Sequence, residues 1–242
     1  MLSGPGAGAA GVPLIGLAHG SRHPDAAASL ERLLAAVARV APVPVQPAYL
    51  DLLEPDLPAA AAALAAAGHR RAVAVPLLFT SAFHATVDVP QSAQEAIAGT
   101  GLDLRIAPIL GTGDDAAALL DRVLTELPAD PGAEVLLYAV GSSDEAANDA
   151  VRALAARLTA LRGAPVRAAF GTRPPRGVEL LEARLADPLR TRPLVVVPLF
   201  TAPGLLLDPM TAAAREHGVP ITGPLEGRLA ALVLDRYRQA LG

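Results

Sequence analysis

The chain has 242 residues, a formal net charge of −4 at pH 7 and no cysteine. The missing cysteine excludes disulfides, thiolate nucleophiles, cysteine-bound zinc and iron–sulfur clusters. All twenty cationic side chains are arginines, so lysine Schiff-base chemistry and a Walker-type phosphate loop are excluded as well. The arginines form no basic stripe for nucleic acid, and no apolar run reaches about 18 residues. We expect a cytoplasmic protein that binds neither nucleic acid nor a membrane and starts with a short leader.

Along the first half, short apolar runs alternate with helical patterns. Predicted strands cover 14–18, 43–49, 72–78 and 104–109, and predicted helices cover 25–40, 56–67, a segment ending near 98, and 114–127. The sequence Asp130-Pro131-Gly132 then interrupts the pattern. Strands that alternate with helices predict a parallel sheet covered by helices on both faces.

After this break the series starts again. The predicted strands are 135–140, 166–170, 194–199 and 219–222, and the predicted helices are 144–161, 178–186, 210–217 and 226–241. We therefore predict an α/β fold made by tandem duplication of a four-stranded parallel-sheet unit. The two lobes are expected at 11–128 and 132–242, with a cleft between them.

Matching motifs at the strand ends support the duplication. The segment Ala18-His19-Gly20-Ser21 aligns with Ala139-Val140-Gly141-Ser142, and His19 and Val140 are 121 residues apart. Pro76 and Pro198, each at the end of a predicted third strand, are 122 residues apart. The near-constant offset indicates two copies of one unit.

Three polar residues follow the predicted strands of the first half: His19, Asp51 and His84. Ligands bind outside the carboxyl ends of the strands in an open α/β sheet. With strand order 2-1-3-4, the first and third strands are neighbours about 4.8 Å apart, so two imidazoles can converge on one ion. The aligned residues of the second half, including Val140 and Thr172, cannot do this. We predict one metal or acid–base site on the first lobe, with Asp51 as a third ligand.

The positions of five further residues make them candidates for substrate binding. Ser21 and Arg22 follow His19 in a loop suited to anions. Ser81, Arg173 and Arg176 are the other candidates for substrate binding.

The remaining histidines are interpreted as outside the site. His23 is expected to be solvated, and His69 and His217 are expected to be structural residues at helix ends. Asp88 recurs as Asp208, which we interpret as shared architecture such as helix capping.

The segments LAHGSRHPDA, AYLDLLEPDLPAA and VPLLFTSAFHATVDVP resemble the sirohydrochlorin chelatases, the class II chelatases of cobaltochelatase and ferrochelatase type. The resemblance covers essentially the whole chain and is to the two-lobed form with histidines on one lobe. It implies that His19 and His84 bind the metal and act on the macrocycle, whereas Asp51 stands where that family usually has Glu. It also implies insertion of Fe²⁺ or Co²⁺ into sirohydrochlorin for siroheme or cobalamin, without an organic cofactor. Imidazole ligands also accept Ni²⁺, so the residues leave the choice of metal open.

Other functions remain open from the residues alone. Two histidines and a carboxylate also match the facial triad of non-haem iron oxygenases. A carrier of a metal or tetrapyrrole would keep the same histidines without turnover, and a duplicated scaffold could use them structurally. For a chelatase we expect neutral imidazoles to be required, with a nearby carboxylate raising their pKa and activity lost as the pH falls through about 6–7.

Overall fold

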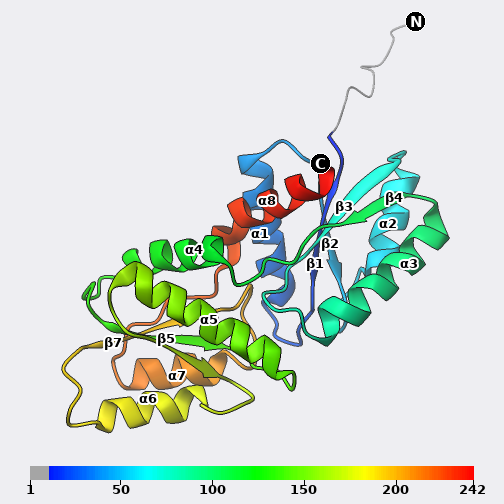
Figure 1. Ribbon diagram of the computed structural model, residues 1–242. Coiled ribbons are helices and arrows are strands. Elements are labelled where there is room, and N and C mark those ends of the chain that lie inside the picture. Colours follow the sequence, from blue (N-terminus) through cyan, green and yellow to red (C-terminus); the bar gives the residue numbers. More distant parts are fainter. Residues whose placement is uncertain (1–10) are drawn as a thin grey trace, which may run out of the picture.

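The computed structural model describes residues 11–242; the first ten residues, part of the expected leader, lie outside the described residues. Two α/β lobes lie side by side (Figure 1). The elements of the first half are β1 (Leu14–Ala18), α1 (Ala26–Val40), β2 (Val45–Tyr49), α2 (Leu57–Ala66), β3 (Arg71–Pro76), the π-helix η1 (His84–Asp88), α3 (Val89–Thr100), β4 (Asp103–Ile106) and α4 (Asp114–Thr125).

The second half repeats this order. Its elements are β5 (Glu134–Ala139), α5 (Glu145–Arg162), β6 (Val166–Phe170), α6 (Gly177–Ala186), β7 (Leu194–Pro198), α7 (Asp208–Glu216), the 3₁₀ helix η2 (Glu226–Leu229) and α8 (Ala230–Leu241). None of the helices between residues 11 and 242 has the length and apolar composition that a membrane crossing requires.

Both sheets are parallel, with strand orders β2-β1-β3-β4 and β6-β5-β7. The prediction of four strands in the second lobe is therefore wrong. The predicted strand at 219–222 makes only an isolated bridge between Ile221 and Val196. Pro220 has no N–H to donate, so this segment cannot continue a regular ladder.

The side chains of each strand alternate between two cores. In β1, Ile15 and Leu17 pack under α2 and α3, whereas Leu14 faces α1. In β5, Leu136 faces the outer core under α6 and α7, whereas Leu137 joins the core that contains Leu14. This middle core runs through both lobes and holds them together.

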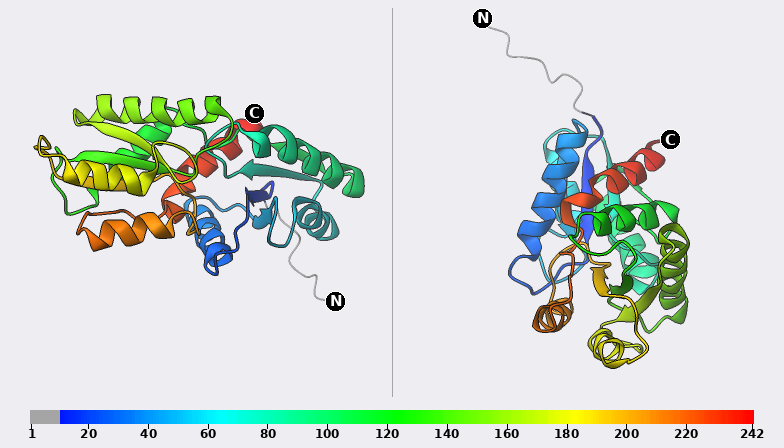
Figure 2. Two further views of the ribbon diagram at one scale, coloured as in Figure 1. Left: turned by 90° about the horizontal axis from the view of Figure 1, so that it is seen from below. Right: turned by 90° about the vertical axis from the view of Figure 1, so that its left-hand side faces the viewer.

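Each half of the chain contributes one helix to the lobe formed by the other half. The helix α8, at the end of the second half, packs on α1 and β3 of the first lobe, and α4 packs along α5 of the second (Figures 1 and 2). The repeat boundaries 11–128 and 132–242 stay a prediction. The sequence repeat assigns α4 to the first half and α8 to the second, whereas each of these helices packs on the other lobe. From here on, the first lobe means the sheet β2-β1-β3-β4 with the helices packed on it, and the second lobe means the sheet β6-β5-β7 with its helices.

Backbone hydrogen bonds repeat with the sequence offset. The N–H of Asp51 donates to the carbonyl of His19 at 2.9 Å, and the N–H of Thr172 donates to that of Val140 at 3.0 Å. Likewise Leu77 bonds Leu17 in the first sheet, as Leu199 bonds Tyr138 in the second. The pairing of His19 with Val140 in the two lobes therefore holds at the level of the backbone.

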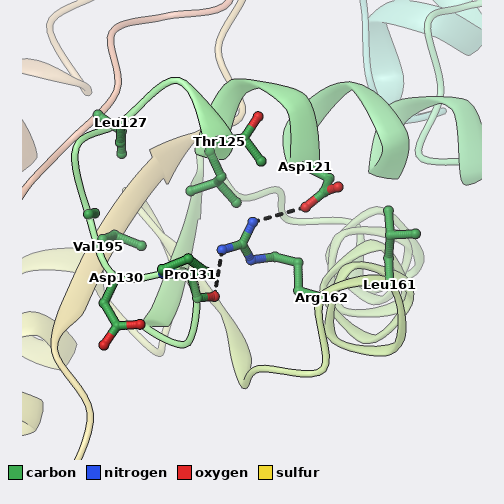
Figure 3. A pocket seen from close by; sticks show the side chains of 10 residues that line it. Asp121, Thr125, Leu127, Asp130, Pro131, Leu161, Arg162 and Val195 are labelled. Atoms are coloured by element: carbon green, nitrogen blue, oxygen red, sulfur yellow. Dashed lines mark hydrogen bonds and ion pairs between the residues drawn. The ribbon is translucent and has the colours of Figure 1, made fainter.

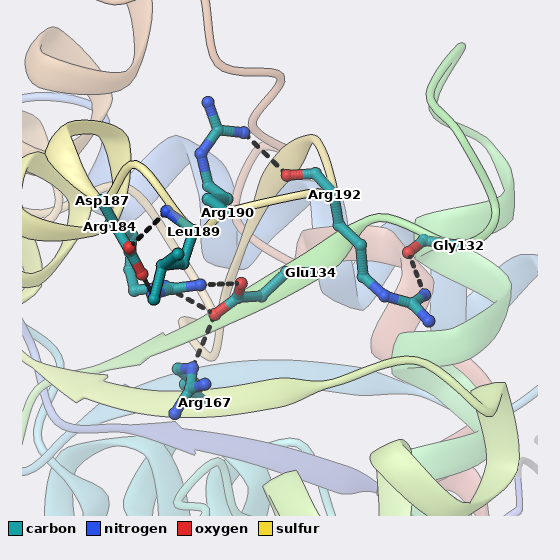
Figure 4. A network of polar contacts seen from close by, with 8 residues as sticks. All are labelled: Gly132, Glu134, Arg167, Arg184, Asp187, Leu189, Arg190 and Arg192. Atoms are coloured by element: carbon teal, nitrogen blue, oxygen red, sulfur yellow. Dashed lines mark hydrogen bonds and ion pairs between the residues drawn. The ribbon is translucent and has the colours of Figure 1, made fainter.

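A buried carboxylate anchors the start of the second sheet. The first residue of β5, Glu134, is 3% exposed and accepts hydrogen bonds from Arg167 at 2.6 Å and from Arg184 at 2.8 and 3.0 Å (Figure 4). Burial by itself raises the pKa of Glu134, but these hydrogen bonds outweigh it and hold that pKa below its usual value. The carboxylate is thus ionised at neutral pH, and its stabilising effect is lost only as the pH falls through the lowered pKa.

Replacing Glu134 with glutamine is expected to lower the free energy of unfolding by about 2–3 kcal/mol, because Arg167 and Arg184 lose the buried charged partner that they share. Urea denaturation measures this loss. The matched control is Glu179→Gln, because the Arg176–Glu179 pair is long, at 4.0 Å, and exposed. The control should change stability by less than about 0.5 kcal/mol. Equal losses in the two variants would contradict the assignment.

Candidate functional site

The two predicted histidines meet at the edge of the first sheet. Because β1 and β3 are parallel neighbours, with Leu17 opposite Pro76, the segments that follow them leave the sheet together. His19 comes directly after β1, and His84 begins the π-helix η1 after β3. Their ring centroids are 4.1 Å apart, with 37° between the ring planes. Two imidazoles this close can bind one ion or share proton-transfer steps.

The π-helix places a carboxylate on His84. Its widened turn is closed by the Val89 N–H bonding the His84 carbonyl, and the Asp88 carboxylate lies 2.6 Å from His84 Nδ1. Asp88 makes no capping hydrogen bond, so its interpretation as a helix cap is wrong. A carboxylate on Nδ1 fixes the ring and directs Nε2 outward, as for histidines that bind metals. The i, i+4 spacing of His84 and Asp88 was the signal in the sequence for this contact.

His19 is half-buried, and its Nδ1 atom is buried without a hydrogen-bond partner. Burial lowers the pKa of His19 below its ordinary value, and the neighbouring charge of a protonated His84 lowers it further. Asp51 and Asp88 act in the opposite direction without reversing the shift. The carboxylates therefore act in the expected direction, but burial is the larger effect and the pKa of His19 is lowered overall. His19 is neutral at pH 7 and can act as a ligand or proton acceptor.

Asp51 lies beside the pair but does not line the cleft described below. Its N–H binds the His19 carbonyl, and its exposed carboxylate accepts the Leu52 N–H at 2.7 Å. Between residues 11 and 242, no three His, Asp or Glu side chains are grouped closely enough to hold one ion. The metal-ligand role of Asp51 stays a prediction. Gly20 permits the close approach of this loop: its φ is +97°, and a Cβ there would lie 1.8 Å from the Asp51 carbonyl oxygen.

A cleft of about 720 Å³ opens beside the histidines and is lined by both lobes. The first lobe contributes residues 18–22, 77–80 and 82–85, and the second contributes 139–144 and 199–206. Much of the lining is apolar, including the exposed side chains of Phe83, Val140, Leu205 and Leu206. The cleft can therefore take a large ligand with an apolar body next to the two imidazoles.

The predicted substrate-binding residues separate into two groups. Ser21 and Arg22 line the cleft, whereas Ser81, Arg173 and Arg176 do not. Arg176 instead contacts the Gly171 carbonyl at 3.4 Å. The roles of all five toward a substrate stay predictions.

His23 is not solvated as expected. Its imidazole is 14% exposed, and its Nε2 lies 3.7 Å from the Asp208 carboxylate of the second lobe. The expectation failed because the partner comes from a segment 185 residues away in the sequence.

A second cavity, of about 300 Å³, lies within the second lobe (Figure 3). Arg162 lines it and binds Asp121 at 2.9 Å and the Pro131 carbonyl at 3.0 Å. None of its lining residues lines the cleft, and it contains no histidine. The cleft is therefore the candidate site.

Comparison with known proteins agrees with this assignment of the fold. Residues 13–127 match the sequence profile of the family CbiX, while none of the curated proteins compared with the chain matches it. Bacillus subtilis SirB with Fe³⁺ has 21% sequence identity and a TM-score of 0.78, with 94% of each chain covered. The sirohydrochlorin chelatase SirB from Bacillus subtilis subspecies spizizenii, in complex with cobalt, has 20% identity and a TM-score of 0.76, again over 94% of each chain.

CbiX, the terminal enzyme for siroheme biosynthesis in denitrifying bacteria, has 23% identity and a TM-score of 0.67 over 95% of this chain and all of the other. The resemblance that the motifs indicated is thus confirmed. The first lobe matches the CbiX family model, and over its described length the chain has the two-lobed fold of the sirohydrochlorin chelatases.

Proposed function

We propose that this protein inserts a divalent metal ion, Fe²⁺ or Co²⁺, into sirohydrochlorin, a step of siroheme or cobalamin biosynthesis. The observation that carries the proposal is the pair His19 and His84, with rings 4.1 Å apart in a cleft between two chelatase-like lobes. The Fe³⁺ and cobalt complexes of SirB support a metal as the second substrate.

Insertion exchanges two pyrrole N–H protons for one divalent ion. The protein must hold the ion loosely enough to release it and must accept the protons near neutral pH. His19 suits this because its lowered pKa keeps it neutral. His84 suits it because Asp88 occupies Nδ1 and leaves Nε2 for the ion or a proton. We propose that the reaction needs no organic cofactor.

The macrocycle is proposed to lie between the lobes. Leu205 and Leu206 of the second lobe and Phe83 of the first offer apolar surfaces for its faces. Its carboxylates would reach the loop of Ser21 and Arg22, where a guanidinium can bind a carboxylate in bidentate fashion. Ser81, Arg173 and Arg176 are proposed only for carboxylates that extend beyond the cleft. A cytoplasmic location without nucleic-acid or membrane partners is part of the same proposal.

Arg22→Ala is expected to raise KM about tenfold while changing kcat less than twofold, because a contact shared by the bound substrate and the transition state is lost. Steady-state insertion kinetics measure both constants. Arg39→Ala serves as the control, since this exposed arginine in the last turn of α1 does not line the cleft, and its KM should stay at the parental value. A fall in kcat at unchanged KM would reject the binding role of Arg22.

Anaerobic mixing with sirohydrochlorin and each ion tests the function, with insertion followed in the visible spectrum of the macrocycle. With protein far below the substrate concentration, a chelatase converts many equivalents. Conversion or binding limited to one equivalent would instead identify a carrier of the metal or the tetrapyrrole.

A further inference from the structure

The contact between His23 and Asp208 joins the two lobes beside the cleft. His23 lies in the loop between β1 and α1, and Asp208 is the first residue of α7. The distance from His23 Nε2 to Asp208 Oδ2 is 3.7 Å. Arg22, next to His23, and Leu206, two residues before Asp208, both line the cleft, one from each lobe.

The imidazole of His23 is held in place from its own loop. The backbone N–H of His23 donates to Ser21 Oγ, and the ring Nδ1 accepts the backbone N–H of Asp25, both at 3.1 Å. Because Nδ1 is an acceptor, the proton of the neutral ring is on Nε2, the nitrogen that faces Asp208. The ring therefore offers a donor to the carboxylate without needing to be charged. The hydrogen bond to Ser21 also ties the position of His23 to that of the loop that contains Ser21 and Arg22.

The backbone at Asp208 is held to the turn that lines the cleft from the second lobe. The N–H groups of Leu207 and Asp208 both donate to the Gly204 carbonyl, at 2.8 and 3.2 Å. This turn carries Leu205 and Leu206, which line the cleft. A contact to the Asp208 carboxylate therefore also fixes the position of the apolar wall, which is formed by Leu205 and Leu206.

Comparison of the repeats indicates why the second lobe has an aspartate here. In the first lobe Asp88, before α3, holds His84. Asp208 occupies the corresponding place at the start of α7, but the second lobe has no histidine on the preceding turn. Its contact is His23 of the other lobe.

The other ion pairs between the lobes lie elsewhere among the described residues. Arg236–Asp115 and Arg228–Glu126 join the exchanged helices, between the α8–η2 segment and α4. The His23–Asp208 pair instead joins the loops around the cleft.

We propose that His23 and Asp208 form a latch that sets the width of the cleft and keeps the apolar wall at Leu205 and Leu206 opposite the paired histidines. Its effect on insertion rests on the proposed function, whereas its effect on lobe distance does not. A contact of this kind, with one exposed partner, changes an equilibrium by a factor of about 1.5 to 5. His23 is thus a positioning residue that favours the closed cleft.

The chain lacks cysteine, so spin labels can be placed at chosen sites. We would label Gln91→Cys on α3 and Glu216→Cys on α7, two exposed positions on different lobes, and measure their distance distribution by double electron–electron resonance. His23→Ala and Asp208→Asn are each expected to reduce the short-distance population by up to about fivefold. The double variant should match the single ones, because both remove the same contact.

His23→Gln is the rescue variant, since its amide N–H can replace that of Nε2, and it should restore the short-distance population. In the insertion assay, His23→Ala should raise KM and leave kcat nearly unchanged. Unchanged distances in both His23→Ala and Asp208→Asn would overturn the latch, even if insertion were slower. Failure of the parental protein to insert metal would instead reject the proposed function and leave the distance result standing.

Discussion

Replacing His84 with alanine is expected to lower the rate of metal insertion by about 10²- to 10⁴-fold, the usual contribution of a positioned acid–base group. The ring centroid of His84 lies 4.1 Å from that of His19, so its loss leaves His19 without its paired imidazole. His19→Ala should have an effect of similar size. Spectroscopic insertion assays under anaerobic conditions measure both rates.

Stability should distinguish a chemical role from a structural one. The side chain of His84 is partly exposed, so its variant should unfold within a few degrees of the parental Tm. His217→Ala is the matched control, because His217 lies exposed at the end of α7 and does not line the cleft. It should insert metal at the parental rate. Parental rates for His84→Ala or His19→Ala would refute the site.

The second large effect is expected from pH. An imidazole binds a metal or accepts a pyrrole proton only when it is neutral, and it is protonated below its pKa. Because burial and His84 lower the pKa of His19, its neutral form persists to lower pH than in an exposed histidine. Insertion should therefore hold at pH 7 and fall only below about 6.5, the ordinary histidine pKa. Rate–pH profiles between pH 4.5 and 8 measure the midpoint.

Asp51→Asn should move this midpoint further toward acid, because the carboxylate of Asp51 raises the pKa of His19. Asp103→Asn is the control: this carboxylate lies with Arg71, at 3.4 Å, and contributes no shift to His19. A midpoint that moves toward neutral pH in Asp51→Asn would contradict the electrostatic account. A profile that stays flat down to pH 5 would show that neutral imidazoles are not the working groups.

The order of strands and helices was predictable because buried parallel strands and amphipathic helices have distinct periods. The exchange of α4 and α8 was not predictable, since an apolar helix face does not specify which sheet it covers. The prediction of a fourth strand in the second lobe was wrong for a local reason. Pro220 has no N–H and so interrupts the hydrogen bonds that a strand ladder needs.

The histidine pair was predictable because neighbouring parallel strands bring their carboxyl ends to one edge. The contacts of Asp88 and His23 were missed for different reasons. The first depends on a π-helical turn, and the second crosses between lobes. Arg173 was assigned by analogy between repeats, but the loop after β6 does not bring it to the cleft.

The central claim is that one ion is held by His19 and His84 on the first lobe. Crystals soaked in Co²⁺ without oxygen, with data at the cobalt edge, test it most directly through an anomalous difference map. The account predicts one main peak at about 2.0–2.2 Å from a nitrogen of each ring, and no peak beside Val140. A peak bound by His23, His69 or His217, with none between His19 and His84, would contradict it.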